Sequence, residues 1–313
     1  MKVLLIDGNA VGYHAQQARP LKTADGEPTQ AIFHSIKALW NLKKRYPDHT
    51  PLCLWDAHCQ WRYDILPEYK GKRDNDERQR LMREEYREQR PAIKEAFDYM
   101  GITQVEHEGY EADDIAGLYA RKVACLDDSS AVLYTGDKDW LQLVSENVIW
   151  HDIRTDKRVS LKNFSRETGF DNPSQFLQAK ALHGDGSDNI GGVGSIGEKT
   201  ADKLLQHFGS VKALLRYHKD NGDFEKGDFE DAGLNRARKH INNFCNNTNG
   251  GIELYKRNLK LMNLHSIDPP DKGFFRKRSK PSLDSFSELC ARYDMTTLVT
   301  RAEQIINDME GKS

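Results

Sequence analysis

The sequence predicts an α/β fold with a parallel sheet, and the prediction depends on three short apolar runs and the acids that follow them. The runs are Val3–Ile6, Leu52–Trp55 and Ala131–Tyr134, and longer amphipathic stretches separate them. Such runs are typical of buried parallel strands, which helices cover on both faces. Each run is followed within three residues by aspartate, at positions 7, 56 and 137.

These aspartates indicate a functional edge of the sheet. In open α/β sheets, ligands bind beyond the carboxyl ends of the strands. Asp7 and Asp56 follow their strands directly, and Asp137 is accompanied by Asp139. Strands that are remote in sequence therefore deliver carboxylates to one edge.

The elements between these strands follow from local patterns. Thr29 can cap a helix whose apolar face is Ile32, Phe33, Ile36, Leu39 and Trp40. Ile102–Val105 is a further predicted strand, and YEADDIAG at 110–117 opens the helix after it.

The acids of that helix start, Glu111, Asp113 and Asp114, have two explanations. Acids at a helix N-terminus are favoured by the helix dipole, so capping alone can account for them. If they join the other aspartates, mutual repulsion requires raised pKa values or divalent cations. Oxygen ligands without histidine or cysteine select hard ions such as Mg²⁺ or Mn²⁺, and two such ions are a common means of hydrolysing a phosphodiester.

Composition excludes several classes of protein. The chain has 313 residues, of which 38% are hydrophobic and 30% charged, with a mean hydropathy of −0.76. No apolar run approaches the roughly 18 residues of a membrane span, and MKVLLID at the start is a strand and not a signal peptide, so we expect a cytoplasmic protein. The five cysteines lack paired spacing and are expected to be reduced thiols.

Charge is balanced overall but not locally. The net charge of −2 does not by itself indicate a nucleic-acid partner. Two basic runs lie at Lys70–Lys94 and Lys272–Lys280, although the first also carries acids at salt-bridge spacing. A solvated helix face is therefore an alternative to a nucleic-acid contact.

The segment LPEYKGKR at 66–73 contains a candidate phosphate site. Lys70 and Arg73, three residues apart at a predicted helix start, would share one face and reach one phosphate. Tyr69 offers a ring on which a base can stack. An ordinary surface turn is the alternative.

A glycine-rich segment, HGDGSDNIGGVGSIGEKTA at 183–201, predicts a second phosphate contact. A helix at Pro173–Leu182 precedes it and another helix follows Thr200. Exposed N–H groups at such a helix start bind phosphate without reading sequence, so helix, glycine hairpin and helix form a duplex-backbone binder. Asp185 and Asp188 connect this hairpin to the acidic edge.

In order and spacing these segments resemble the 5′-nucleases, which comprise flap endonucleases, phage 5′-exonucleases and the 5′-nuclease domain of bacterial DNA polymerase I. The resemblance covers roughly residues 1–265 and rests on LLIDGN (4–9), DGEPTQA (25–31), LWDA (54–57), LPEYKGKR (66–73), EADDIAG (111–117), TGDKDWLQLV (135–144) and GDGSDNIGGVGSIGEKTA (184–201). It implies a PIN-like or Rossmann-like parallel-sheet nuclease core with a helical arch, and a helix-three-turn-helix module. It also implies metal-dependent hydrolysis of DNA, and of RNA in RNA–DNA hybrids, at free 5′ ends, nicks and 5′ flaps during replication or repair.

The resemblance assigns roles to individual residues. Asp7, Asp56, Glu111 and Asp113 match ligands of a first Mg²⁺ or Mn²⁺ ion, and Asp114, Asp137, Asp139 and Asp188 match ligands of a second, with Asp185 in support. Lys70 and Arg73 match the pair that holds the scissile phosphate, and Tyr69 matches the aromatic that stacks on the displaced nucleotide. Contacts to DNA are implied for Gly192, Gly194, Ser195, Gly197, Lys199 and Thr200, and a K⁺ ion for the carbonyls of Val193 and Ile196.

The sequence also departs from the family pattern. His14 stands where polymerase I domains carry a phosphate-contacting arginine, and Arg19 is the residue that can compensate. The stretch Asp74–Arg90 is longer and more charged than in those domains and closer to the arches of free-standing phage enzymes. Because no polymerase follows Ser313, we expect a stand-alone, phage-type or bacterial enzyme that acts as a monomer.

Three regions are expected: a catalytic region at 1–179 with its arch at about 66–100, a hairpin module at 180–250, and a basic C-terminal segment at 251–313 that packs back on the core. Within the last, Glu253–Leu264 is a returning strand or a short helix. Two other functions compete with a nuclease. A haloacid-dehalogenase-type phosphatase requires an acid where Asn9 stands, and a catalytically silent DNA-binding scaffold would not need the acids.

Overall fold

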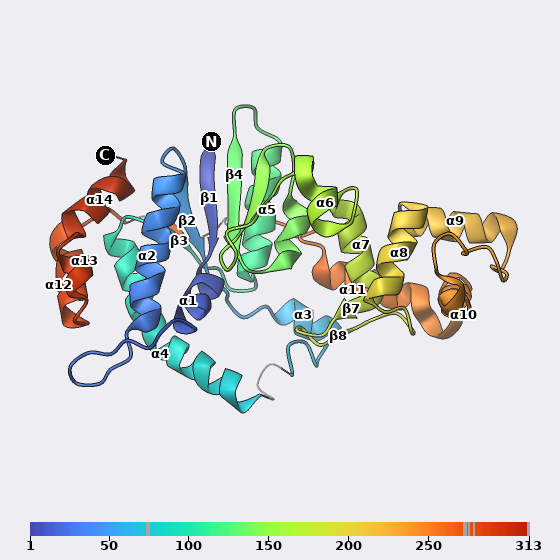
Figure 1. The fold of residues 1–313 in the computed structure, drawn as a ribbon, viewed down its shortest axis with the longest axis horizontal. Helices are drawn as coiled ribbons and strands as arrows, with labels where there is room; N and C mark the ends of the chain where they lie inside the picture. The colour runs from blue at the N-terminus through green and yellow to red at the C-terminus, as the bar shows by residue number, and fades with distance from the viewer. Residues whose placement is uncertain (73–75, 272–273, 275, 278, 312–313) are drawn as a thin grey trace.

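A seven-stranded sheet forms the centre of the computed structural model, which describes residues 1–72, 76–271, 274, 276–277 and 279–311 (Figure 1). The strand order is β6-β5-β4-β1-β2-β3-β9. The parallel strands are β1 (Lys2–Asp7), β2 (Thr50–Leu54), β3 (Thr103–Val105), β4 (Ser130–Thr135) and β5 (Val148–Asp152). The edge strands β6 (Arg158–Val159) and β9 (Arg276–Lys277) run antiparallel to their neighbours.

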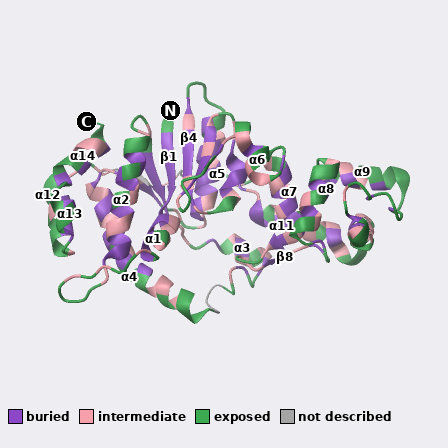
Figure 2. Ribbon diagram, viewed as in Figure 1, coloured by how far each residue is buried: buried purple, intermediate pink, exposed green. Residues whose placement is uncertain are grey.

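Helices cover both faces of the sheet, as the apolar runs predict. Val3 and Leu5 pack in one core cluster with the residues of α5 (Ala112–Ala124), whereas Leu4 and Ile6 pack in another with α2 (Gln30–Arg45) and α4 (Glu77–Tyr99). This alternation follows from the two-residue period of a strand. Figure 2 shows the strands almost wholly buried between these layers.

The remaining elements of the catalytic region are short. They are α1 (Gly8–Gln16), α3 (Gln60–Ile65), η1 (Lys138–Leu143), η2 (Leu161–Asn163) and α6 (Phe164–Thr168). The C-terminal half of α4 is buried in the core, whereas its N-terminal half is largely exposed (Figure 2). The predicted arch is thus anchored at one end of α4.

A helical module lies at one end of the molecule, drawn in yellow and orange in Figure 1. Its elements are α7 (Pro173–His183), β7 (Gly184–Asp185), β8 (Ile190–Gly191), α8 (Glu198–Phe208), α9 (Val211–Asn221), η3 (Asn235–Ala237), α10 (Arg238–Cys245), η4 (Thr248–Gly250) and α11 (Gly251–Met262). The β7–β8 hairpin between two helices confirms the predicted helix, hairpin and helix. One core cluster runs from Val3 into Tyr255, so the module and the catalytic region share buried apolar surface.

The C-terminal helices α12 (Leu283–Arg292), α13 (Thr296–Val299) and α14 (Ala302–Glu310) belong to the core cluster of α2 and α4 at the other end of the molecule. Trp40 of α2 donates an indole N–H hydrogen bond to Asp308 of α14 at 2.7 Å. The return of the whole segment 251–313 to the core stays a prediction, with which these contacts agree. Among the helices that the structure describes, none has both the length and the apolar character to span a bilayer.

Three local expectations need adjustment. Thr29 occupies the N-cap position of α2, but its side chain makes no capping hydrogen bond. Residues 253–262 are helical in α11, so the strand alternative is wrong. Lys70 lies in a turn with a φ of 58° and not in the first turn of a helix, because α4 begins only at Glu77.

Candidate active site

Strand register brings the predicted aspartates to one edge of the sheet. Asp7, the last residue of β1, pairs with Leu54 of β2, and Ile6 pairs with Tyr134 of β4. The chain therefore leaves β1, β2 and β4 at the same level, and Asp56 and Asp137 follow at once. The convergence expected from the sequence is what the structure shows.

The first of these acids is fixed by the elements around it. Asp7 caps α1 by accepting the Ala10 N–H at 2.9 Å, and its other oxygen accepts the Thr135 hydroxyl at 2.8 Å. The same hydroxyl accepts the Asp137 N–H at 3.0 Å. The ends of β1 and β4 are thus tied together through Thr135.

The start of α5 joins the group from the β2 side. Asp56 accepts the N–H of Ala112 at 2.8 Å, and the Trp140 indole N–H donates to Asp113 at 2.6 Å. These bonds use the unpaired donors of a helix N-terminus and a buried indole. Both explanations of the acids at this helix start therefore hold. Asp56 caps α5 from outside the helix, and Asp113 of α5 lies close to Asp7, Asp56 and Asp137.

The pKa values show how strongly these acids repel one another. Burial raises the pKa of Asp113 well above its usual value, and the charges of Asp137, Asp56, Asp7 and Glu111 raise it further. Burial and Asp56 raise the pKa of Asp7 to about 6. The surrounding protein displaces water from the Asp137 carboxylate, although one side of this residue is open to solvent. This desolvation, together with the charge of Asp139, raises the pKa of Asp137 to about 7.

A second acidic group surrounds an ammonium group. Lys180 of α7 contacts the Asp139 carboxylate and also bonds Asp185 at 2.8 Å. Burial alone would raise the pKa of Asp185, but Lys180 and the Ser187 hydroxyl hold it at about 2. The Lys180 pKa is raised in turn by the two carboxylates, against the effect of burial.

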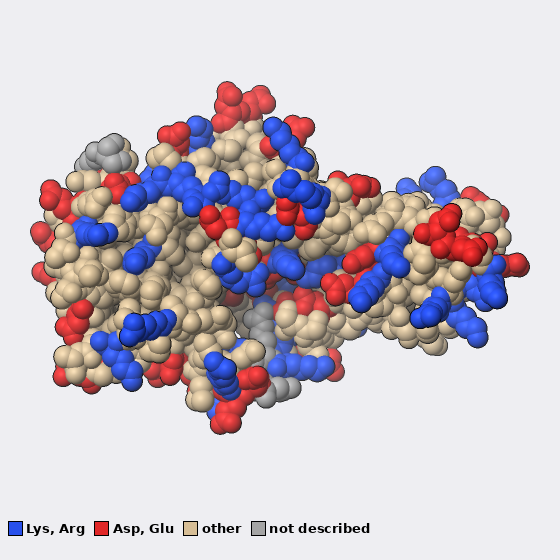
Figure 3. All heavy atoms as spheres, in the orientation of Figure 1, with Lys and Arg blue, Asp and Glu red and all other residues tan. Residues whose placement is uncertain are grey.

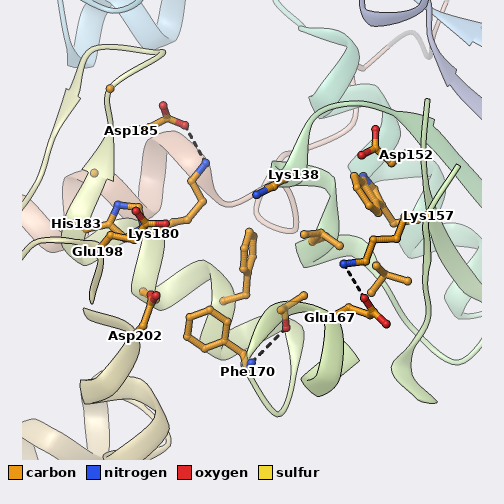
Figure 4. Close-up of a pocket in the computed structure, with 18 of the residues that line it drawn as sticks. Lys138, Asp152, Lys157, Glu167, Phe170, Lys180, His183, Asp185, Glu198 and Asp202 are labelled. Carbon is orange, nitrogen blue, oxygen red and sulfur yellow. Dashed lines mark hydrogen bonds and ion pairs between the residues drawn. The ribbon is translucent and has the colours of Figure 1, made fainter. Parts of the chain in front are cut away.

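Figure 4 shows the ion pair of Lys180 and Asp185 at a 630 Å³ cavity between the catalytic region and the module. Lys138 and Lys180 extend toward one another from opposite sides of the cavity, and Lys157 pairs with Glu167 at 2.6 Å farther along its wall. Lys180 was not singled out from the sequence. Its place three residues before the glycine hairpin, on the last turn of a helix, was the available signal.

Tyr69 has a different role from the predicted one. Its ring is only 3% exposed, so it cannot stack on a nucleotide in this structure. Its hydroxyl bonds Glu111 at 3.0 Å and Asp188 at 2.9 Å, and Lys70 contacts the other oxygen of Glu111. The stacking assignment is therefore corrected: Tyr69 connects two acids of the site. Arg73 lies outside the described residues.

Asp114 also departs from its predicted role. Its carboxylate is fully buried and accepts two hydrogen bonds from Arg62, at 2.6 and 2.7 Å, as well as the Glu111 N–H at 2.9 Å. These bonds occupy both oxygens of the carboxylate. This contradicts a metal-binding role for Asp114, because a bidentate arginine pair is a structural ion pair.

In the described part of the chain, no three acid, histidine or cysteine side chains are arranged to hold an ion. Three neighbouring acids, Glu111, Asp114 and Asp139, are held by the cations Lys70, Arg62 and Lys180. The chemistry of the donors nevertheless fits hard divalent cations. Asp7, Asp56, Asp113 and Asp137 are close enough to raise the pKa of Asp113 together, which is the situation that a cation relieves.

A 710 Å³ cleft opens beside these acids, with charge of opposite sign on its two sides. Asp7, Asp56 and Asp137 line one side, and Arg83, Arg87 and Arg90 of α4 line the other, which we call the arginine face. Their spacing along a helix places them on one side, a signal that the sequence contained. Tyr13 of α1 also lines the cleft and is partly exposed, so it is the aromatic ring available for stacking.

The glycine hairpin exposes most of its predicted DNA contacts. Gly194, Ser195, Gly197 and Lys199 are exposed, and Gly192 and Thr200 are half-buried. The side chains of Val193 and Ile196 are buried, and the Val193 carbonyl accepts the Ile196 N–H at 3.1 Å. Arg19 is exposed in the segment after α1. His14 in α1 is also exposed at its surface, and partial burial of its ring and nearby Arg154 lower its pKa.

Comparison with known proteins finds family models and relatives that resemble this chain. A family model described as the N-terminal resolvase-like domain of 5′-3′ exonuclease matches residues 2–169, and one described as its C-terminal SAM fold matches residues 171–244. The chain is 36% identical over 230 residues to DNA polymerase I of Lactococcus lactis subsp. cremoris, covering 68% of this chain but only 25% of that protein. It is 28% identical over 317 residues to a 5′-3′ exonuclease of Aquifex aeolicus, covering 100% of this chain and 99% of the other.

Among solved structures, the bacteriophage T5 D15 flap endonuclease, in a complex with DNA and metal ions, superposes with a TM-score of 0.64 at 21% identity. The superposition covers 99% of this chain and 100% of that chain. At this identity the likeness concerns the fold: a parallel-sheet core that carries a helical module.

Proposed function

The chain belongs to the 5′-3′ exonuclease family, and from this premise we propose that it is a divalent-metal-dependent nuclease that hydrolyses phosphodiesters of DNA at free 5′ ends, nicks and 5′ flaps. The observation that carries the proposal is the meeting of four carboxylates from β1, β2, β4 and α5 opposite the arginine face. Such a site holds cations on one side and phosphates on the other.

Asp7, Asp56, Asp113 and Asp137 are the residues that would hold the first cation, and Asp139, Asp185 and Asp188 are available for a second. Bound Mg²⁺ or Mn²⁺ would supply Lewis-acid stabilisation of the phosphate and lower the pKa of a water. The protein's own groups do the remaining work. Lys70 is placed beside Glu111 to offset charge on the scissile phosphate, and Tyr13 offers a ring to the adjacent base.

Basic surface outside the cleft supports the choice of nucleic acid as the substrate. Figure 3 shows Lys and Arg gathered in a band over the C-terminal end of α2 and the turn between β5 and β6. Arg45, Arg154 and Arg158 are exposed there. The glycine hairpin with Lys199 offers a second, sequence-independent grip on a duplex backbone. RNA–DNA hybrids as further substrates, a K⁺ ion at Val193 and Ile196, a monomeric state and action in the cytoplasm of a bacterium or a phage-infected cell belong to the same proposal.

The decisive test changes one carboxylate of the site. Asp137→Asn should abolish cleavage of a 5′-flap, a nicked duplex and an RNA–DNA hybrid with Mg²⁺, while binding to the flap without divalent ions stays within about threefold. Asp127→Asn, an exposed acid before β4 at the opposite edge of the sheet, is the matched control and should cleave normally. Normal cleavage by Asp137→Asn would refute the proposal, and DNA binding by the unchanged chain without any cleavage on adding Mg²⁺ or Mn²⁺ would favour a silent scaffold.

A further inference from the structure

A 280 Å³ groove lies apart from the cleft, on a surface to which the proposed function assigns no role. Trp61 of α3 forms one wall, Gly109 and Tyr110 form the second, and Lys260 of α11 with the following loop at 266–268 forms the third. None of its lining residues lines the catalytic cleft. We call it the aromatic groove.

The aromatic groove is continuous with the acidic site through two hydrogen-bonded segments. The Ala57 N–H donates to the Tyr110 carbonyl at 3.1 Å, and the Gly109 N–H donates to the His58 carbonyl at 2.9 Å. The neighbouring residues in the same two segments are Asp56 and Glu111, which belong to the acidic site. The aromatic groove and the acidic site are therefore built on the same two segments of the chain.

The two aromatic walls are held in place by the protein. The Arg62 guanidinium lies 4.5 Å from the centre of the Trp61 ring, and Tyr110 donates its hydroxyl to the Asp268 carbonyl at 3.0 Å. Phe274 packs edge-on against Tyr110 at 5.5 Å. Rigid, partly exposed rings can receive a base at little cost in conformational entropy.

The groove also has room and charge for a nucleotide. An atom built at the Cβ position of Gly109 would have no neighbour within 4 Å, so the wall is open at this point. Lys260 is exposed at the lip on the side formed by α11, and the exposed Asp268 also lines the groove. Aromatic rings beside a cation are the combination that holds single-stranded nucleic acid, since a paired base keeps its faces inside the duplex.

From this geometry we propose that the aromatic groove binds an unpaired base of the 5′ flap, with Lys260 beside the adjoining phosphate. The occupant follows from the combination of aromatic walls with the Lys260 ammonium, and from the place of the groove on the two segments that carry Asp56 and Glu111. The proposal rests on the proposed function, which supplies the flap. It adds a subsite that a nicked duplex without a flap does not fill.

The test measures binding without divalent ions, so that no cleavage is needed. The probes are a duplex with a 5′ flap, the same flap with abasic sites, and a nicked duplex without a flap. Trp61→Leu should weaken binding to the normal flap by about tenfold, or about 1.4 kcal/mol, through the loss of base stacking. Lys260→Ala should weaken it by a similar factor through the loss of a phosphate contact. Binding to the nicked duplex should change less than twofold.

Two controls isolate the groove. Lys256→Ala removes an exposed lysine one turn earlier on the same helix and should bind all probes normally. Abasic sites should weaken binding by the unchanged chain but not by Trp61→Leu, and a 2-aminopurine in the flap should be quenched only when Trp61 is present. A melting temperature for each variant distinguishes lost binding from lost folding.

Equal binding of normal and abasic flaps by the unchanged chain would overturn the proposal, as would equal losses on the flap and on the nicked duplex. Either result would leave the proposed function standing if the nicked duplex is still cleaved with Mg²⁺. Failure of the unchanged chain to cleave any probe with Mg²⁺ would instead count against the proposed function. The binding of normal and abasic flaps would still decide whether the aromatic groove binds an unpaired base.

Discussion

Tyr69 contributes to the acidic site through its hydroxyl group and not through an exposed aromatic ring. The ring is buried, and the hydroxyl lies within 3.0 Å of Glu111 and 2.9 Å of Asp188. It therefore supplies the link between the start of α5 and the β7–β8 hairpin. A residue that stacks on DNA would need an aromatic ring that is exposed to solvent.

The substitution Tyr69→Phe separates the two roles. We expect it to lower the free energy of unfolding by about 1–3 kcal/mol, because a buried acceptor loses its donor. It should also reduce kcat on a 5′ flap, since Glu111 and Asp188 are no longer held together. Tyr13→Phe, which keeps a ring at the cleft, is the control and should retain activity. Full activity and stability in Tyr69→Phe would restore the stacking assignment.

Asp114 and Arg62 form the other residue-scale pair that the structure redefines. The carboxylate is fully buried and its partner guanidinium nearly so. Breaking such a pair leaves a charge in a low-dielectric interior, which costs about 3–5 kcal/mol.

We therefore expect Asp114→Ala to lower the melting temperature strongly, whereas Asp113→Ala should lower it little and abolish cleavage. Circular dichroism with and without Mg²⁺ distinguishes the two variants. The double variant Arg62→Leu with Asp114→Leu should recover part of the stability, because no buried charge is then left unpaired. If Asp114→Ala is as stable as the unchanged chain but inactive, Asp114 is a metal ligand after all.

At the scale of elements, α4 combines a buried anchor with an exposed, basic end. Gln89 bonds Gln16 of α1 at 2.8 Å and the Ala31 N–H of α2 at 3.0 Å, and Tyr86 bonds Asn9 at 3.0 Å. These bonds orient the arginine face toward the acids. Because the anchor is on α1, which Asp7 caps, the acidic site and the arginine face are fixed by the same helix.

Substitution in the arginine face should weaken DNA binding through charge alone. Arg87→Ala should raise KM for a flap substrate and reduce the slope of log K against log salt by about 0.7–0.9, the value for one lost phosphate contact. Arg78→Ala lies on the same helix but outside the cleft and serves as the control. An unchanged salt slope in Arg87→Ala would show that this residue contacts no phosphate.

At the scale of the whole molecule, the site joins the two ends of the fold. Lys180 and Asp188 come from the module, and their partners Asp139 and Tyr69 come from the catalytic region, where Tyr69 also bonds Glu111. The shared core cluster holds them in position. The boundary predicted at 179 and 180 therefore falls inside one packed unit, and its exact place stays a prediction.

The acids of the site also give the whole molecule a defined pH dependence. Asp7 and Asp137 have folded-state pKa values of about 6 and about 7, above the usual 3.8. Between about pH 4 and pH 7 the folded chain therefore binds more protons than the unfolded chain, and its stability falls as pH rises through this window. The lowered pKa of Asp185, about 2, acts in the opposite sense and only as pH falls below about 4.

We therefore expect the melting temperature without divalent ions to fall between pH 5 and pH 7.5, and Mg²⁺ to raise it more at pH 7.5 than at pH 5. Calorimetry at both values with EDTA or Mg²⁺ measures this. Asp137→Asn should flatten the dependence. The lowered pKa values of His14 and His151 act in the opposite sense and are common to both chains, so an identical pH dependence in the unchanged chain and in Asp137→Asn is the result that would contradict the raised pKa of Asp137.

Local patterns in the sequence determined the parallel sheet, the acidic edge and the glycine hairpin. Apolar runs, strand ends and glycine spacing each involve only neighbouring residues, and they also gave the acids Asp7, Asp56, Asp113 and Asp137, to which the family resemblance added the roles of metal ligands. The tertiary structure alone decided that Arg62 forms an ion pair with Asp114, that Tyr69 is buried, and that Lys180 lies between Asp139 and Asp185. Except for Lys180 with Asp185, these pairs join residues 41 to 119 positions apart, such as Lys180 with Asp139 and Tyr69 with Asp188. Which of several adjacent acids meets a cation is settled by packing between elements, and no local spacing encodes that choice.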